Sequence, residues 1–239
     1  MKLTKSFNIV TSAILAMVAS TAAHADIYSS LTPDQQAAIN PGQQVSADPQ
    51  DVDGSAWPRV TIYQRAEATP DQVAAVMFDY NLHKTMFAPK KDANGKVTSA
   101  GITESTADRT GAANTNILYS MVFPSVLGIS LPEEHYTVND VIAASASGYQ
   151  ITWTFVKATS MKDTSGSVQF ERLGTGTLIA YTNFISPPRP ALAKLITKMY
   201  VQQVKDTVTS LVAQVASERN GNQAQLNAQL SLLSKALGR

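Results

Sequence analysis

The 239-residue sequence contains no cysteine. This absence excludes disulfide bonds, thiolate metal sites, cysteine nucleophiles and a lipid-modified cysteine near the N-terminus. The chain also has little excess charge, since its formal net charge is +1, and this argues against a nucleic-acid-binding protein with a strongly basic face. Hydrophobic residues make up 44% of the chain and charged residues 15%, so we expect a globular protein held together by packing alone.

The motifs of several common catalytic and metal sites are missing as well. The sequence has no His-x-x-x-His pair, no Gly-x-Ser-x-Gly turn, no P-loop and no dinucleotide-binding fingerprint. Asp51, Asp53 and Gly54 resemble part of a calcium-binding loop, but Pro49 and Val60 occupy the positions of its first and last ligands. We therefore expect neither a metal ion nor any other cofactor.

Residues 1–25 have the pattern of a cleavable signal peptide. Lys2 and Lys5 supply the positive start, an apolar stretch follows at 9–19, and residues 23–25 (Ala-His-Ala) give the small-x-small cleavage pattern before Asp26. The apolar stretch is well short of the ~20 residues that a membrane-spanning helix needs. The sequence thus predicts a soluble periplasmic protein that begins at Asp26, with secretion from the cell as the less favoured alternative.

The remaining chain divides into a polar arm, a main domain and a C-terminal helix. The arm covers residues 26–57 and contains one helix start, at Thr32-Pro33-Asp34-Gln35, which residues 40–42 (Asn-Pro-Gly) end quickly. The main domain covers residues 58–219. Residues 220–239 form an amphipathic helix with leucines at positions 226, 230, 233 and 237.

Within the main domain, strand patterns outnumber helix patterns. A strand at 59–68 precedes two short helices, the first beginning at Thr69-Pro70-Asp71-Gln72 and the second at 81–87. Six strand candidates then follow in series with short connections, which predicts an antiparallel meander. They cover residues 97–106, 114–123, 134–143, 149–158, 165–173 and 177–186.

A long helix at 190–218 closes the domain. Its ~28 residues extend for about 42 Å, which is enough to cover the buried face of a curled sheet. The fold class is therefore α+β, with a curved antiparallel β-sheet wrapped around a long C-terminal α-helix and two short helices after the first strand. Space between sheet and helix that side chains leave unfilled would accommodate a ligand.

Several local motifs resemble the helix-grip superfamily, which includes START lipid-transfer domains and polyketide cyclases. The matching segments are 68–73 (Ala-Thr-Pro-Asp-Gln-Val) with 78–80 (Phe-Asp-Tyr), 151–153 (Ile-Thr-Trp) with 166–168 (Gly-Ser-Val), and 176–178 (Gly-Thr-Leu) with Tyr181. The first helix departs from many relatives, since Ala74, Ala75 and Val76 occupy the turn where those proteins carry a tryptophan. The resemblance implies the same fold and an internal cavity for a hydrophobic small molecule, such as a lipid, a sterol-like compound or an isoprenoid.

Alternating apolar side chains on the strands and one stripe of the long helix are the candidate ligand-binding residues. Side chains at period two share one face of a sheet, so those on the concave face would border the cavity. The alternative is an ordinary filled core, which the sequence does not distinguish from a cavity. The candidates are Tyr119, Met121, Phe123, Ile151, Trp153, Phe155, Phe170, Leu195, Ile196 and Met199.

The connection at 124–132 adds two further candidates, Leu127 and Ile129. This connection lies between Pro124 and Pro132 and is unusually apolar for a loop, although loops normally lie on the surface. One hypothesis is that it gates the cavity mouth and makes transient contact with a membrane or with ligand tails. The equally plausible alternative is that the loop folds back on the domain's own core.

Two other functional hypotheses remain open at this point. A cyclase- or dehydratase-type enzyme would use His135, Asp140 or Arg172 in the same cavity for acid–base chemistry. An interaction module would use the leucine face of the C-terminal helix, whose alternative is packing on its own domain. The sequence leaves the identity of the ligand and the oligomeric state open.

Overall fold

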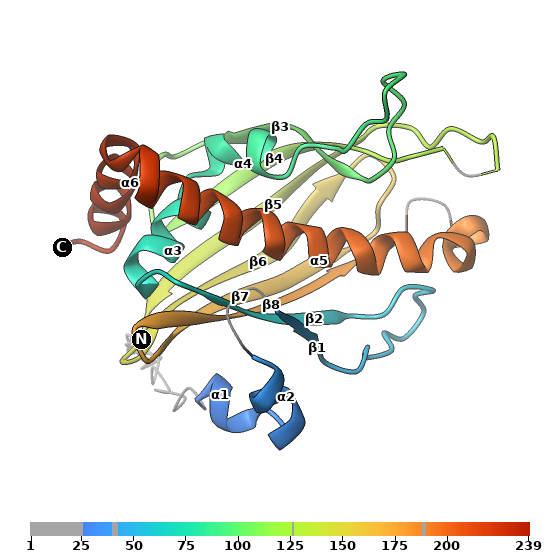
Figure 1. Cartoon of the computed structure of the whole chain (residues 1–239). Helices are drawn as coiled ribbons and strands as arrows, with labels where there is room; N and C mark the ends of the chain where they lie inside the picture. Colours follow the sequence, from blue (N-terminus) through green and yellow to red (C-terminus); the bar gives the residue numbers. More distant parts are fainter. Residues whose placement is uncertain (1–25, 40–42, 126, 188–189) are drawn as a thin grey trace, which may run out of the picture.

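The computed structural model of the chain describes residues 26–39, 43–125, 127–187 and 190–239, apart from the side chains of 190–192 and 195. The predicted signal peptide and the predicted helix stop at 40–42 lie outside these residues. The described part is one curved antiparallel sheet with a long helix across its concave face (Figure 1). This arrangement confirms the predicted α+β architecture.

The sheet has eight strands in the order β1-β2-β8-β7-β6-β5-β4-β3. Strands β3 to β8 form the predicted meander, and β2 completes the sheet by pairing with β8, so that Val60 lies opposite Asn183. The strand bounds are β1 Gln44–Ser46, β2 Val60–Ala66, β3 Gly101–Ala107, β4 Asn114–Val122, β5 Glu134–Ala144, β6 Gly148–Ala158, β7 Thr164–Leu173 and β8 Gly176–Ile185.

Three short helical segments follow β2 and cover one end of the sheet. Helix α3 (Pro70–Phe78) begins with the predicted capping box, in which the Thr69 hydroxyl accepts from Gln72 N and the Gln72 side chain accepts from Thr69 N. The 3-10 helix η1 (Tyr80–Leu82) and α4 (His83–Met86) replace the single second helix expected at 81–87. Helix α3 packs on β6 and β7, and α4 on β3.

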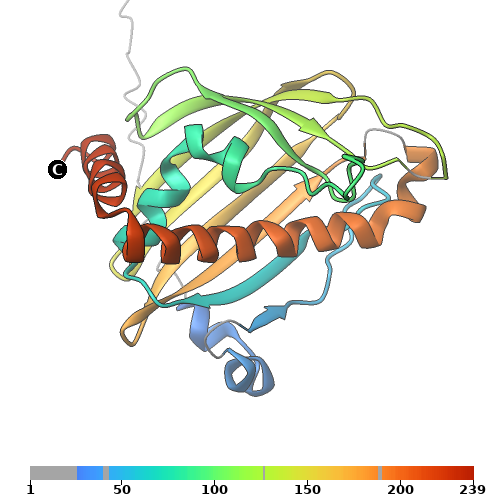
Figure 2. The ribbon, with the colours of Figure 1, turned by 45° about the horizontal axis from the view of Figure 1, so that its top comes forward.

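Helix α5 (Pro190–Gly221) runs along the whole concave face of the sheet (Figure 2). Val204, Val208, Leu211 and Val215 are all buried, at the three–four spacing of a helix stripe that packs inward. Because the sheet curls around this helix, the two elements enclose a hollow wherever their side chains do not meet.

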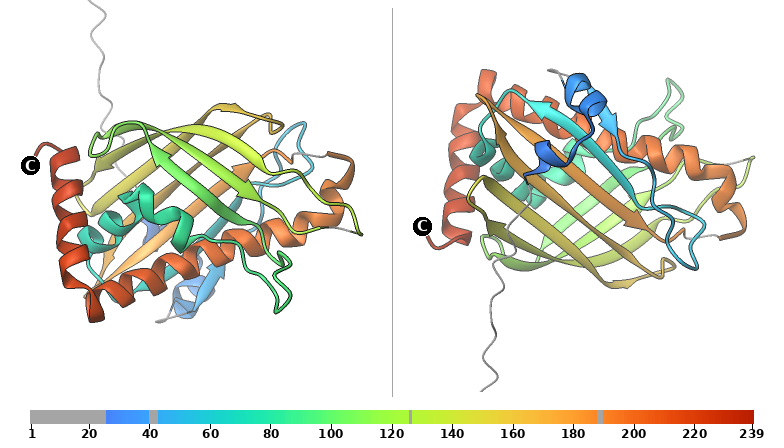
Figure 3. Two further views of the ribbon diagram at one scale, coloured as in Figure 1. Left: turned by 90° about the horizontal axis from the view of Figure 1, so that it is seen from above. Right: turned by 90° about the horizontal axis from the view of Figure 1, so that it is seen from below.

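Helix α6 (Gln223–Ala236) packs against α3 at the end of α5 (Figure 3). Leu226 and Leu233 are buried in the main core, and Leu230 and Leu237 pack against it in part. The leucine face therefore packs on its own domain. This was the alternative to the hypothesis that it serves as a docking surface.

The N-terminal arm places its two helices on the convex face of the sheet (Figure 3), while Gln44 in its edge strand donates to Lys205 O and to the Thr209 hydroxyl of α5 at 2.8 and 2.9 Å. It consists of α1 (Ile27–Ser30), α2 (Pro33–Ala38) with the predicted Thr32 cap, and the edge strand β1. Ile27, Leu31 and Ile39 form a small second core with Leu178 and Ala180 of β8. The arm thus covers apolar residues of β8 that the main core does not contact.

Candidate functional site

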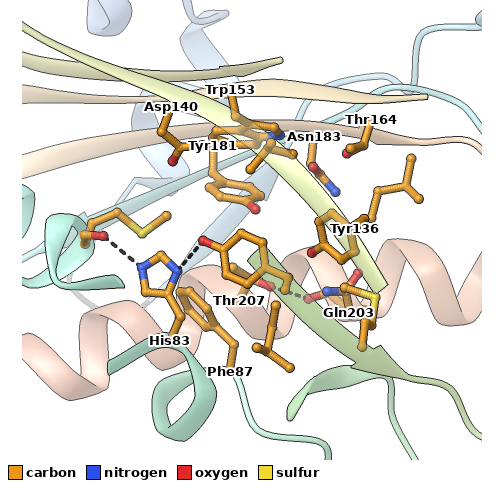
Figure 4. Close-up of a pocket in the computed structure, with 16 residues that line it drawn as sticks. His83, Phe87, Tyr136, Asp140, Trp153, Thr164, Tyr181, Asn183, Gln203 and Thr207 are labelled. Atoms are coloured by element: carbon orange, nitrogen blue, oxygen red, sulfur yellow. Dashed lines mark hydrogen bonds between the residues drawn. The ribbon is translucent and has the colours of Figure 1, made fainter. Parts of the chain in front are cut away.

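A hollow between the concave sheet face and α5 is the candidate ligand site. Side chains from α3, α4, all strands from β3 to β8 and α5 line it (Figure 4). The open volume of this hollow is about 70 Å³. We call it the aromatic pocket; its lining residues are Met77, His83, Phe87, Ile102, Tyr119, Met121, Tyr136, Val138, Asp140, Trp153, Thr164, Tyr181, Asn183, Ile185, Gln203 and Thr207.

Stacked and tilted rings form part of the wall of the aromatic pocket. The ring of Tyr119 lies 5.3 Å from that of Tyr136, and the ring of Trp153 lies 5.3 Å from that of Tyr181, measured between centroids. The Tyr136 and Tyr181 hydroxyls have no hydrogen-bond partner among the described residues, and burial raises the pKa of both phenols. The wall therefore combines apolar ring faces with phenol groups that remain protonated.

His83 is held in one neutral form by two hydrogen bonds. Its Nε2 lies 2.8 Å from the carbonyl oxygen of Met77, which only accepts, so Nε2 carries the proton. Its Nδ1 therefore accepts from the Tyr119 hydroxyl, at 2.8 Å. Burial lowers the pKa of His83 to about 4, because a charged imidazole would be poorly solvated here. Both ring nitrogens are occupied, so His83 positions Tyr119.

Asp140 is a buried carboxyl group on this aromatic wall. It points inward from β5, its residue is 4% exposed, and its Oδ1 has no hydrogen-bond partner. Burial raises the pKa of Asp140 to about 7, and the nearby Tyr80 hydroxyl opposes that shift without making a full hydrogen bond. Near neutral pH the group is thus available both as an acid and as a base.

A second, smaller hollow adjoins the aromatic pocket and shares Ile185 and Gln203 with it. We call it the apolar pocket, because carbon atoms dominate its lining and no described side chain in it is charged. It lies beside the 124–132 connection, from which Leu131 enters its wall. The other residues that line it are Trp57, Ala100, Phe123, Ile196, Met199 and Tyr200.

Six of the ten ligand-binding residues predicted on the strands and the long helix line one of the two pockets. Tyr119, Met121 and Trp153 line the aromatic pocket, whereas Phe123, Ile196 and Met199 line the apolar pocket. Ile151 and Phe170 are buried in the core, where α3 packs on their strands, and border neither pocket. Phe155 is half-buried beside a register shift between β5 and β6. Leu195 belongs to α5, but its side chain lies outside those described.

The two loop candidates are exposed. Leu127 is 82% exposed with a backbone φ of 51°, in the left-handed region that costs energy for a leucine, and Ile129 is 41% exposed. Leu131 of the same connection is buried beside the apolar pocket. The connection is therefore anchored at Leu131 and presents Leu127 and Ile129 to the surroundings.

Of the three acid–base candidates, Asp140 alone borders the aromatic pocket. His135 is exposed and its Nδ1 bonds to the Ser120 hydroxyl at 2.8 Å, while Arg172 is exposed at the end of β7. His135 lies at an outward-facing position of β5, whereas Arg172 shares the parity of the buried Phe170 but emerges at the strand end, so neither reaches the hollow.

Sequence reasoning missed His83, Tyr136 and Asn183 as pocket residues. The signal for Tyr136 was present, because Tyr136, Val138 and Asp140 alternate along β5 as the aromatic residues do along β6. His83 gave no such signal, since its position depends on the turn between η1 and α4.

Among the described residues, no group of three or more histidine, aspartate and glutamate side chains is arranged to hold a metal ion. None of the helices described is both long and apolar enough to cross a membrane.

Comparison of the sequence with models of known families gives no match, and neither does comparison with curated proteins. Solved structures with the same fold are nevertheless found. A STAR-related lipid transfer protein fragment from Xanthomonas axonopodis superposes with a TM-score of 0.56 at 13% identity, over 72% of this chain and 98% of that one. Human STARD10 gives a TM-score of 0.56 at 11% identity, over 83% of this chain and 85% of that one.

A third structure, TTHA0849 from Thermus thermophilus, gives a TM-score of 0.52 at 15% identity, over 67% of this chain and 98% of that one. At these identities the likeness concerns the fold. The chain therefore has the START-like helix-grip fold that its motifs suggested.

Proposed function

We propose that the protein binds a hydrophobic small molecule, such as a lipid, a sterol-like compound or an isoprenoid, in the two joined pockets. The observation that carries this proposal is the incomplete filling of the space between sheet and α5, with aromatic walls on one side and an apolar extension on the other. The solved structure named as a STAR-related lipid transfer protein supports it through the common fold. Such a protein would shield its ligand from water and carry it between membranes.

The energetics of capture are favourable. Burying about 400 Å² of an apolar tail yields roughly 10 kcal/mol before the costs of association and ordering are subtracted. The open volume is smaller than a whole lipid, so the side chains around the apolar pocket must move apart on binding. Met199 is well suited to this, because an unbranched thioether side chain repacks easily.

The direct experiment is native mass spectrometry of the protein purified from its own cells, followed by mass analysis of an organic extract. The expected result is a bound apolar compound that is absent from a matched extract of an unrelated periplasmic protein. A protein that carries no guest and takes up none from a mixed lipid extract would contradict the proposal.

The exposed loop residues support contact with a membrane at the mouth. Leu127 and Ile129 are exposed in the connection whose Leu131 lines the apolar pocket. The exposed Lys194 and Lys198 on the first turns of α5 add positive charge suited to anionic lipid. Vesicle co-sedimentation tests this contact. The wild type should sediment with anionic vesicles, whereas the double variant Leu127→Ser, Ile129→Ser should stay in the supernatant.

An acid–base enzyme of the cyclase or dehydratase kind is the second candidate function. The specific observation in its favour is Asp140, whose raised pKa of about 7 suits proton transfer near neutral pH. Hydrogen–deuterium exchange or dehydration of the compound extracted from the native protein, followed by mass spectrometry, tests it; Asp140→Asn should abolish turnover without releasing the compound.

Export to the periplasm fits the contacts of the first residues after the predicted cleavage site. The backbone N–H groups of Ile27 and Tyr28 donate to the Glu171 carboxylate at 2.6 and 3.3 Å, and Ile27 is buried. A chain that begins at Asp26 keeps these contacts. The intact mass of protein from a periplasmic extract should therefore correspond to a start at Asp26.

A further inference from the structure

Two buried carboxyl groups on β5 differ in what surrounds their oxygens. Glu134 accepts from Ser160 N at 2.6 Å, from Met161 N at 3.1 Å and from the Ser160 hydroxyl. Asp140 faces the same side of the strand, but its Oδ1 is buried without any hydrogen-bond partner. Glu134 holds the connection between β6 and β7 in place. Among the described residues, Asp140 has only the nearby Tyr80 hydroxyl as a polar neighbour, and this hydroxyl makes no full hydrogen bond to it.

Aromatic rings surround Asp140. Trp153 is its direct cross-strand partner on β6, and Tyr181, Tyr119 and Tyr136 contribute to the same pocket wall (Figure 4). The face of an aromatic ring carries negative electrostatic potential and attracts a cation placed over it. The carboxyl group and the rings therefore favour the same kind of guest, one with positive charge.

The protein supplies no such charge itself within the aromatic pocket. Its lining contains no lysine or arginine, and its one histidine, His83, is neutral with both ring nitrogens engaged. A buried carboxylate is costly without a counter-charge. Without a guest, Asp140 avoids this cost by keeping its proton, and a counter-charge for its ionised form must come from outside the described residues.

The size of the pocket fits a compact head group. Its open volume of about 70 Å³ corresponds to roughly five to seven water molecules. A substituted ammonium group is of that size, and Ile185 and Gln203, which the two pockets share, mark where a chain attached to it would pass into the apolar pocket.

We propose that the aromatic pocket binds the ammonium group of a cationic amphiphile, with Asp140 as counter-ion and the surrounding rings as a cage, while the tail lies in the apolar pocket. This inference rests on the proposed binding function and adds the chemical class of the ligand's polar end.

The test uses three ligands with the same tail: dodecyltrimethylammonium, dodecanol and dodecanoate, each below its micelle-forming concentration. Binding to the delipidated mature protein is measured by calorimetry at pH 8. The expected result is that the cation binds about tenfold or more tightly than the alcohol, with dodecanoate weakest. Asp140→Asn should remove the preference for the cation and leave dodecanol binding within about twofold.

Asp163→Asn is the matched control, because it removes an exposed carboxylate outside both pockets and should leave all three affinities unchanged. Equal binding of the three ligands by the wild type would overturn the inference and leave the binding function intact. Binding of none of them, together with failure to take up a mixed lipid extract, would end the proposed function itself.

A pH series on the wild type tests the same point without any variant. The charge of dodecyltrimethylammonium does not titrate, so its affinity should rise about tenfold from pH 5 to pH 8 as Asp140 ionises. The other titratable groups around Asp140 keep their state over this range: the pKa values of the neighbouring tyrosines lie above it and that of His83 lies below it. Those tyrosines are Tyr80, Tyr119, Tyr136 and Tyr181.

Gln203 and Thr207, which α5 contributes to the same pocket, do not titrate. A pH-independent affinity for the quaternary cation would contradict the role of Asp140.

Discussion

The two joined pockets differ in chemistry although one sheet and one helix build both. The aromatic pocket has a buried carboxyl group, phenol hydroxyls and a fixed neutral histidine, whereas the apolar pocket is lined by side chains such as Phe123, Leu131 and Ile196. In a ligand that fills both pockets, polar contacts at one end would provide recognition, and buried apolar surface at the other end would provide affinity. Selectivity and affinity are therefore expected to respond to different substitutions.

Replacing Asp140 by Asn should have the largest effect on the aromatic pocket. The pKa of Asp140 is raised from 3.8 to about 7, so the folded state keeps its proton while the unfolded state loses it. Stability therefore falls as pH rises from 3.8 to about 7, by about 4 kcal/mol in total. Urea unfolding of the ligand-free protein measures this effect. The free energy of unfolding of Asp140→Asn minus that of the wild type should rise by about 4 kcal/mol between pH 3.5 and pH 8. If the two free energies change with pH in parallel, the raised pKa of Asp140 is wrong.

Replacing His83 by Gln should tilt the pH profile in the opposite direction. The folded-state pKa of His83 is lowered from 6.5 to about 4, so the unfolded state binds a proton first as pH falls. Wild-type stability from this group is complete above pH 6.5 and declines by about 3 kcal/mol down to pH 4. His83→Gln removes this pH-dependent loss of stability. The substitution also takes away the Nδ1 acceptor of the Tyr119 hydroxyl, so it should alter ligand contacts in the aromatic pocket and leave those in the apolar pocket unchanged.

Substituting Gly166 by Ala should distort the aromatic pocket from behind. A Cβ there would lie 2.3 Å from Trp153 Cζ2 and 2.2 Å from the carbonyl oxygen of Thr182, so both the indole and the β8 backbone must shift. Overpacking of this kind costs about 1–3 kcal/mol. Thermal unfolding should show that loss, and binding of dodecyltrimethylammonium should weaken more than that of dodecanol; an unchanged melting temperature would contradict the close contact.

The double substitution Leu127→Ser and Ile129→Ser should have the smallest effect on stability. Both side chains are exposed, so the free energy of unfolding should change by less than about 0.5 kcal/mol. Ligand transfer from vesicles should nevertheless slow if the loop contacts the membrane at the mouth. Equal transfer rates for the variant and the wild type would leave the loop without a role in uptake.

Local signals predicted much of the fold. The capping boxes at Thr32 and Thr69 gave two helix starts to the residue, and the turn residues between alternating segments gave the six strands of the meander to within a few residues. The short helix α1 was missed, because its start depends on Asp26 and on Glu171 from a distant strand.

The candidate site was less predictable than the fold. Alternation along a strand shows on which face of the sheet a side chain lies, but it does not show whether other side chains fill the space in front of that face. Tyr119 and Trp153 border the aromatic pocket, yet Ile151 and Phe170, on the same face, are covered by α3. The inward Asp140 is the position where the sequence departs from an apolar face, and that departure marks the pocket.

The pairing of β2 with β8 has a consequence for when the chain can fold. The Thr61 hydroxyl meets the Thr182 hydroxyl, its partner 121 residues later, so β2 has no neighbour in the meander until β8 has been synthesised. Contacts of such long separation form slowly. The complete sheet therefore forms only after β8 has been synthesised, so the step that joins β2 to the meander comes late in translation.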